Sequence, residues 1–219
     1  GFYSKEKNPS TNVISVDENH TVKEVLITPA ITGECNVSLE MFIMRTEFLK
    51  KIVQEAASKS QHSLVRDVLQ GRKDEFVIKG YEHKGVFTKI DGLAAYYQAN
   101  LSLLQADTRA GLFQESAPIY TKVGDNAPVK YGLESNVKNS LVADGCMIEG
   151  TVENCVLFRG VKIAKGAVVR NCVLMQGTEI GEGCNIDAIV ADKNVTISEN
   201  RVLTGSPEYP LYLGKKATI

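Results

Sequence analysis

The residues of this chain that are best suited to chemistry are three histidines. His20 lies in a turn, His62 at a helix start and His83 in a polar loop, and all three precede residue 116. A histidine that acts as a general base must face a substrate within hydrogen-bond reach. The polar neighbours of these three instead favour surface positions.

The five cysteines are odd in number and form no CxxC pair: Cys35, Cys146, Cys155, Cys172 and Cys184. A chain of 219 residues folds without disulfides, so we expect reduced thiols. Cys155 and Cys172 share one position in successive copies of a repeat, where stacking would place them about 4.8 Å apart. A metal or disulfide is conceivable there, but a ladder of small buried residues is the favoured interpretation.

The charge pattern argues against nucleic acid and membrane partners. The formal net charge is −1, and lysine and arginine are dispersed without a basic block. An anionic effector could bind to four basic residues in the first half, although a solvated helix face is the simpler interpretation. They are Lys50, Lys51, Arg66 and Arg72. No apolar run reaches the roughly 18 residues of a membrane helix, and no signal peptide opens the chain, so we expect a cytoplasmic protein.

The first half has a mixed α and β periodicity. It predicts strands at 12–16, 22–28, 37–44, 76–79 and 85–88, with a hairpin turn at 17–20. Apolar residues at helical spacing predict one helix after Thr46, a second that ends at Gly71, and a third from Leu93 to Leu104. Thr46 and Asp91 are the expected N-caps of the first and third helices.

The second half contains an internal repeat. Four twelve-residue copies occupy 137–148, 152–163, 169–180 and 186–197. Within each copy apolar residues recur at intervals of five or six with small residues between them, the hexapeptide pattern of a parallel β-helix. Each copy is therefore predicted to form one coil.

The ninth residue of each copy predicts the corners of these coils. It is Gly145, Gly160, Gly177 and then Asn194, and both residue types tolerate a left-handed backbone. Three such corners per coil make a triangular prism. The stretch 113–133 has little periodicity, so we place the domain boundary near residue 116, between an α/β part (1–115) and a β-helix (116–219).

Three segments carry a family resemblance: Ala-Tyr-Tyr-Gln-Ala-Asn-Leu-Ser-Leu-Leu at 95–104, Pro-Ile-Tyr-Thr at 118–121 and Gly-Lys-Lys-Ala-Thr-Ile at 214–219. They resemble glucose-1-phosphate adenylyltransferases, and the chain is similar to the C-terminal portion of their non-catalytic, GlgD-type subunits. The resemblance implies the end of a nucleotidyltransferase α/β domain followed by a left-handed parallel β-helix. Periodicity alone gives no handedness.

The resemblance also implies that the sugar-phosphate site is degenerate. Active members carry Glu-Glu-Lys-Pro where this chain has Leu-Ile-Thr-Pro, so Ile27 and Thr28 replace an acid and a lysine. A threonine hydroxyl cannot supply the charge-assisted bond of a lysine. Ser38 matches the family, but Glu40 replaces a glycine and would repel an anionic sugar phosphate.

The metal site implied by the resemblance is altered as well. Lys89 falls where active members have the aspartate that binds magnesium, and an ammonium there would exclude the ion. Asp91 would be its substitute if the register is shifted by two residues. The family's Gly-rich nucleotide loop does not occur in this sequence, and in an intact subunit it would precede Gly1.

These positions predict a regulatory or structural, catalytically impaired subunit that acts in glycogen biosynthesis. The resemblance implies a catalytic partner subunit, which would use Mg²⁺, in a heterotetramer; a homo-oligomer also stays open. We expect no catalytic residue and no cofactor in this chain. The alternatives are an active sugar-nucleotide pyrophosphorylase in truncated form and a hexapeptide acyltransferase, although the coils lack a histidine base.

Overall fold

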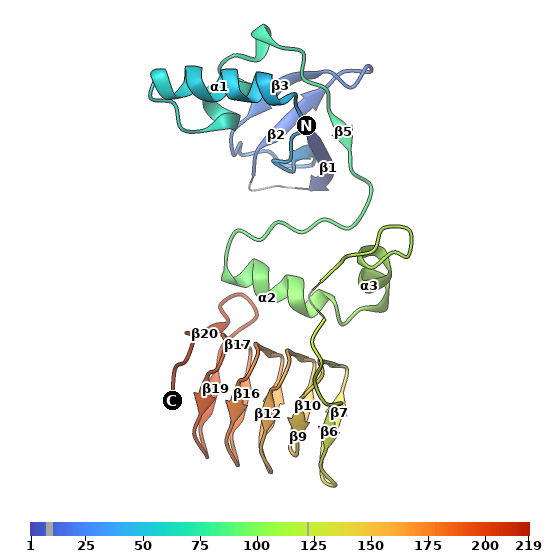
Figure 1. Cartoon of the computed structure of the whole chain (residues 1–219), viewed down its shortest axis with the longest axis vertical. Coiled ribbons are helices and arrows are strands. Elements are labelled where there is room, and N and C mark those ends of the chain that lie inside the picture. The colour runs from blue at the N-terminus through green and yellow to red at the C-terminus, as the bar shows by residue number, and fades with distance from the viewer. Residues whose placement is uncertain (8–10, 122) are drawn as a thin grey trace. The chain divides into compact units, whose positions relative to one another are not determined.

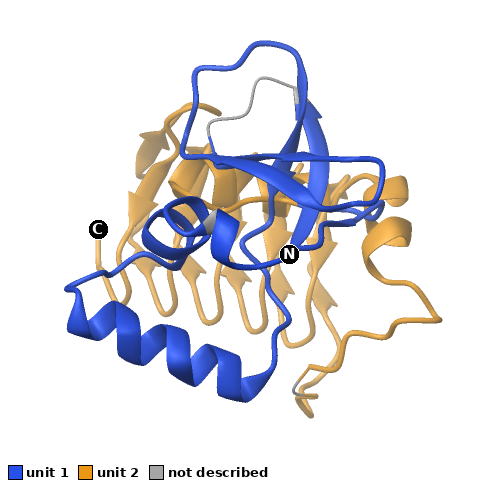
Figure 2. Ribbon diagram, turned by 90° about the horizontal axis from the view of Figure 1, so that it is seen from above, with its two compact units in different colours: residues 1–87 blue, residues 88–219 orange. Residues whose placement is uncertain are grey.

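A computed structural model describes residues 1–7, 11–121 and 123–219. Contacts divide the chain into two compact units, residues 1–87 and residues 88–219, coloured separately in Figure 2. Within these described ranges, no helix has the length and apolar character needed to cross a membrane.

Unit 1 is built on a five-stranded sheet with strand order β3-β2-β4-β1-β5. Its strands are β1 (Phe2–Lys7), β2 (Val13–Val16), β3 (Val22–Leu26), β4 (Glu34–Ser38) and β5 (Tyr81–Glu82). All neighbours are antiparallel except β1 and β5. Tyr3, Ile14 and Val25 form the core of this sheet, with Val65 packed against them.

Three helical segments lie between β4 and β5 in unit 1. They are α1 (Thr46–Ser58), the π-helix η1 (Leu64–Gln70) and the 3₁₀ turn η2 (Lys73–Glu75). The two helices predicted here are confirmed in position, but the second has π rather than α geometry. The N-cap prediction for Thr46 was wrong, because Arg45 occupies the cap and Thr46 is the first helical residue.

Two strands predicted in the first half are absent from the described structure. Residues 76–79 contribute only an isolated bridge between Thr21 and Lys79, and residues 85–88 form no strand. Both segments are short, and a short apolar run gains strand geometry only where a neighbouring strand offers hydrogen bonds. Strand β1, which pairs with β4 over five residues, was not predicted.

Unit 2 contains three parallel sheets of five strands each, stacked as a ladder in Figure 1. The first sheet holds β7 (Asn136–Lys138), β10 (Thr151–Glu153), β13 (Val168–Arg170), β16 (Asn185–Asp187) and β19 (Val202–Thr204). The second sheet holds β8 (Leu141–Val142), β11 (Val156–Leu157), β14 (Val173–Leu174), β17 (Ile189–Ala191) and β20 (Leu211–Leu213). The third sheet holds β6 (Lys130–Tyr131), β9 (Met147–Ile148), β12 (Lys162–Ile163), β15 (Glu179–Ile180) and β18 (Thr196–Ile197).

The register of these strands confirms the predicted parallel β-helix. Val152 pairs with Val169 and Leu157 with Leu174, so equivalent repeat positions lie in neighbouring coils. Inward residues such as Ile148 and Ile163 are at most 1% exposed and form one continuous core. The left-handed sense of the coils stays a prediction from the resemblance.

The corner prediction is confirmed as well. Gly145, Gly160, Gly177 and Asn194 have φ values of 75°, 67°, 69° and 58°. A second column of positive φ, not predicted, runs through the third residue of each copy: Asn139, Asn154, Asn171 and Ala188. The carboxamides of its three asparagines form a hydrogen-bonded ladder that ends on Asp187.

The coil cysteines are buried and unbridged, as expected. Cys155 and Cys172 are fully buried free thiols, and the Cys172 N–H donates to the Cys155 sulfur at 3.4 Å. Burial raises the pKa of the Cys172 thiol well above its ordinary value. These side chains therefore form the predicted ladder of small buried residues.

Helix α2 (Leu93–Ser102) packs on the outer face of the second sheet, and α3 (Ala106–Leu112) follows it. Tyr97 of α2 is 1% exposed and contacts Val173 and Val190. Its hydroxyl donates a 2.7 Å hydrogen bond to the carbonyl of Asn171. Asp91 does not cap the helix, because Gly92 occupies the N-cap position without a side-chain hydrogen bond.

Helix α2 packs with the coils of unit 2, whereas the predicted boundary assigned it to the α/β part. The domain boundary predicted near residue 116 separates repeated from non-repeated sequence. The compact units instead meet between Phe87 and Thr88, so α2 and α3 belong with the coils. The physical reason is the apolar outer face of the second sheet, which α2 covers.

Candidate functional site

The predicted sugar-phosphate remnant lies at one end of β2 and β4 in unit 1. Asn12, just before β2, connects its parts: its side-chain oxygen accepts a hydrogen bond from the Thr28 N–H at 3.2 Å. Its amide nitrogen donates to a carboxylate oxygen of Glu40 at 2.7 Å. The Ser38 N–H donates to the Asn12 carbonyl at 2.9 Å. Asn12 thus joins Thr28, Ser38 and Glu40 into one group, the Asn12 cluster.

The backbone of the Asn12 cluster is strained at two positions. Thr28 has a φ of 42° and Glu40 a φ of 56°, a left-handed conformation that L-residues other than glycine and asparagine rarely adopt. The Glu40 N–H donates to the Ser38 hydroxyl at 3.3 Å. These hydrogen bonds hold the two strained turns next to each other.

The chemistry of the Asn12 cluster does not suit a phosphate. It contributes one carboxylate, one carboxamide and two hydroxyls but no cation. Phosphate recognition relies on arginine or lysine, or on convergent backbone N–H groups. Here the Thr28 and Glu40 N–H groups are already bonded within the cluster. A phosphate would meet the Glu40 carboxylate instead.

The other predicted site residues lie elsewhere. Ile27 is 36% exposed and precedes Thr28 in the chain. Lys89 and Asp91 are exposed and belong to unit 2, just before α2. The assignment of site residues therefore stays a prediction for all five positions: Ile27, Thr28, Ser38, Lys89 and Asp91.

The residues present do not fit a magnesium ion. Among the residues that the structure describes, no three histidine, cysteine, aspartate or glutamate side chains gather closely enough to hold a metal. Lys89 offers only donors, so it cannot be a ligand.

A second candidate region is a hollow on the second sheet of unit 2. Outward positions of this sheet are apolar in successive coils: Leu141, Val156, Val173 and Val190. The equivalent outward positions of the first sheet are charged: Lys138, Glu153, Arg170 and Asp187. The second sheet is therefore built to be covered on its outer face.

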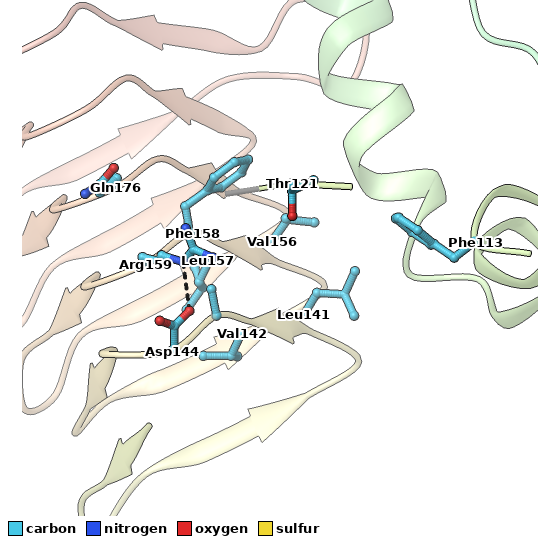
Figure 3. Close-up of a pocket in the computed structure, with 11 residues that line it drawn as sticks. Phe113, Thr121, Leu141, Val142, Asp144, Val156, Leu157, Phe158, Arg159 and Gln176 are labelled. Carbon is cyan, nitrogen blue, oxygen red and sulfur yellow. Dashed lines mark hydrogen bonds and ion pairs between the residues drawn. The ribbon is translucent and has the colours of Figure 1, made fainter. Parts of the chain in front are cut away.

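Helix α2 covers only part of this apolar face. Leu141 and Val156 lie beyond the part that it covers and line a hollow of about 700 Å³. Figure 3 shows Phe158 on the corner beside them, with Phe113 and Thr121 on the side of the linker. The hollow is within the size range of ligand and docking sites.

The charged groups on the rim of the hollow neutralise each other. The Asn126 amide donates to the Asp144 carboxylate at 2.5 Å, and the Arg159 guanidinium donates to it at 3.0 Å. These bonds hold the pKa of Asp144 below its ordinary value. An uncharged occupant could enter the hollow without leaving a charge unpaired.

Sequence reasoning missed both Asn12 and the hollow. Asn12 gave no signal, because a single asparagine before a strand is ordinary. The hollow did give one: the fifth residue of every copy, beginning with Leu141, is apolar. Val156 and Val173 occupy the same position in the next two copies. A β-helix needs apolar residues only at the positions that point into its core, so this additional apolar column on the outside was a signal.

The fold and its repeats define the chain as a hexapeptide-repeat protein with a parallel β-helix. A model of the family described as GlmU-like, C-terminal hexapeptide matches residues 127–208, which includes all four predicted copies.

Within this class, the chain is a relative of the GlgD glycogen biosynthesis proteins and of the glucose-1-phosphate adenylyltransferases. It is 42% identical over 178 residues to the GlgD protein of Bacillus subtilis, an alignment that covers 81% of this chain and 52% of the relative. Identity to the GlgD protein of Geobacillus stearothermophilus is 43% over 132 residues, 60% of this chain and 38% of that protein. Identity to the glucose-1-phosphate adenylyltransferase of the same organism is 34% over 164 residues, 72% of this chain and 41% of the enzyme. The chain thus spans about half, or less, of the length of these relatives.

Proposed function

We propose that the chain belongs to a regulatory or structural, catalytically impaired subunit of a glucose-1-phosphate adenylyltransferase that acts in glycogen biosynthesis. The similarity to two proteins named for glycogen biosynthesis and to the adenylyltransferase supports the pathway. In this proposal the partner subunit converts ATP and glucose 1-phosphate to ADP-glucose and diphosphate, with Mg²⁺ in its own site.

The observation that carries the proposal is the position of Glu40. Its carboxylate is fixed by the Asn12 amide within the Asn12 cluster, beside the strand end where the resemblance expects the sugar phosphate. Thr28 adds no positive charge there. A dianionic phosphate beside a carboxylate is repelled, so substrate binding by this chain is weak.

The heterotetramer with a catalytic subunit is a proposal of the same kind. A rigid β-helix offers a fixed surface against which a catalytic domain can pack, and such an interface lets one subunit change the affinity of another for its ligands. The role of this chain would then be to set the kinetics of its partner.

The proposal is tested with the full-length protein and its cognate catalytic subunit. ADP-glucose formation is measured for each subunit alone and for the mixture, with co-elution on a sizing column. The protein should be silent alone, join the complex and change its kinetics. Robust Mg²⁺-dependent activity of the protein alone would support the active pyrophosphorylase and contradict the proposal.

A matched pair of variants tests the Asn12 cluster directly. The combined substitutions Thr28→Lys and Glu40→Gly should raise the affinity for glucose 1-phosphate about tenfold or more, because one repulsive charge is replaced by an attractive one. The control combines Thr32→Lys with Glu40→Gly, which gives the same net charge four residues away. Equal binding by both variants in calorimetry would show that the cluster is not a sugar-phosphate remnant.

A further inference from the structure

A hollow in unit 1 brings together two of the three histidines of the chain. It has a volume of about 480 Å³ and lies between the turn that follows β2 and strand β5. The residues that line this histidine hollow are His20, Gly80, Tyr81, Glu82, His83 and Lys84. The Asn12 cluster lies at the opposite end of the β2–β3 hairpin, where Val13 pairs with Leu26.

Backbone hydrogen bonds hold the two walls of the histidine hollow together. The Gly80 N–H donates to the His20 carbonyl at 2.7 Å, and Thr21 forms a bridge with Lys79. The Asp17 carboxylate accepts two backbone N–H groups of its own turn, at 2.9 and 2.8 Å. The turn that carries His20 is therefore fixed next to β5.

The ring of His83 is placed by the two residues that follow Lys84. Its Nε2 lies 3.4 Å from the Val86 carbonyl oxygen, and a Cβ added at Gly85 would lie 2.8 Å from two atoms of the ring. A protonated imidazole donates from both of its nitrogens. When His83 is protonated, Nε2 donates to Val86 and Nδ1 remains for a ligand.

Positive charge predominates in the histidine hollow once the histidines are protonated. Of the described residues that line it, only Glu82 is acidic, and its carboxylate lies 4.0 Å from the Lys5 ammonium. Within the part of the chain that the structure describes, the His20 imidazole and the Lys84 ammonium make no hydrogen bond. Three cations therefore face one carboxylate that has its own partner, whereas the Asn12 cluster has no cation.

The charged groups around the histidine hollow are mostly paired with other groups. Asp17 forms an ion pair with Lys23 at 2.9 Å. The Lys79 ammonium donates to a carbonyl and a hydroxyl of the turn, and the Gly1 amino group donates to the Lys79 carbonyl. Glu18, in the turn, is exposed to solvent. An anion is thus left as the partner that suits the two imidazoles and Lys84.

We propose that the histidine hollow binds a phosphate-type anion through His20, His83 and Lys84. Histidinium and ammonium groups form charge-assisted hydrogen bonds with phosphate oxygens, which are about twice as strong as neutral ones. Histidine takes up its proton between about pH 8 and pH 5, so the hollow binds the anion more tightly as the pH falls. This inference does not depend on the proposed function.

The first test follows the ring signals of the histidines by NMR spectroscopy. The full-length protein, without a partner subunit, is titrated with sulfate, which keeps its double negative charge at both pH values used. The signals of His20 and His83 should shift with one dissociation constant, about tenfold lower at pH 6 than at pH 8. Each signal is assigned from the variant that lacks it, and the signal of His62 should not shift.

Three variants test the geometry of the histidine hollow. The His20→Gln variant should weaken sulfate binding about tenfold, because one charge-assisted hydrogen bond is lost. The matched control is His62→Gln, which removes a histidine elsewhere in unit 1 and should leave binding unchanged. The Gly85→Ala variant keeps every charge, but its added Cβ displaces the His83 ring, so it should weaken binding by a similar factor.

Inorganic phosphate and glucose 1-phosphate then distinguish the two sources of such an anion. Tighter binding of glucose 1-phosphate at His20 and His83 would identify a phosphate ester as the ligand, and equal or weaker binding would identify free phosphate. Three results would each overturn the proposal: sulfate that shifts all three histidines alike, a dissociation constant that is the same at pH 6 and pH 8, or a Gly85→Ala protein that binds like the wild type.

Discussion

Replacing Tyr97 by alanine should detach helix α2 from the β-helix. Tyr97 is 1% exposed and packs on Val173 and Val190, while its hydroxyl donates to the Asn171 carbonyl at 2.7 Å. Burial raises the pKa of the Tyr97 hydroxyl to about 12, so it stays a donor at all ordinary pH values.

The expected magnitude follows from these contacts. Truncating a buried aromatic residue to alanine costs about 3–5 kcal/mol. Removing only the hydroxyl, in Tyr97→Phe, costs about 1–2 kcal/mol because the Asn171 carbonyl loses this donor. For a chain of this size each kcal/mol lowers the melting temperature by about 2–4 °C.

The assay combines urea unfolding, followed by circular dichroism, with hydrogen exchange of the α2 amides. The Tyr97→Ala variant should lower the free energy of unfolding of unit 2 and speed exchange throughout α2. The exposed Tyr209 is the control, and its change to alanine should stay within about 0.5 kcal/mol. If Tyr97→Ala costs no more than Tyr209→Ala, the grouping of α2 with the coils is refuted.

Three further predictions address the turn, the corners and the thiols. Hydrogen bonds from backbone N–H groups and the ion pair with Lys23 lower the pKa of Asp17 from 3.8 to about 2. The stability that Asp17 contributes is therefore present above pH 3.8 and is lost as the pH falls toward 2. The Asp17→Asn variant should lack this part of the acid unfolding transition. At Gly160 φ is 67°, and no atom lies within contact of an added Cβ. In urea unfolding, Gly160→Asn should therefore lower the free energy of unfolding by about 1 kcal/mol less than Gly160→Val does, because asparagine tolerates the left-handed backbone better. Equal losses would contradict the corner assignment. A thiol reagent should label at most the half-buried Cys35 in the native protein and all five cysteines in denaturant, whereas native labelling of a coil cysteine would show that the β-helix opens.

The coils were the most predictable part of the molecule. A parallel β-helix repeats the same local environment every turn, so the apolar positions, the corner residues and the cysteine ladder are all visible as a period in the chain. The prediction holds even at Asn194, where the copy has asparagine in place of glycine and the backbone still has a positive φ.

Predictions failed where geometry depended on distant partners. The segment 76–79 has strand-like residues but gains only one bridge, to Thr21, while β1 is a strand because β4 pairs with it along five residues. Propensity describes each segment alone, and strand formation depends on which neighbour supplies hydrogen bonds. The cap at Asp91 failed for a similar reason, since α2 is fixed by its packing on the second sheet.

The sequence by itself determined the class of the fold, because the repeat is a property of residue type and spacing. That Thr28 stands where active members have a lysine stays a prediction from the resemblance. Only the tertiary structure decided that Asn12 joins Thr28, Ser38 and Glu40, that α2 belongs with the coils, and that part of the second sheet stays open. These features depend on residues far apart in the chain coming into contact, and no local pattern encodes which surfaces will meet.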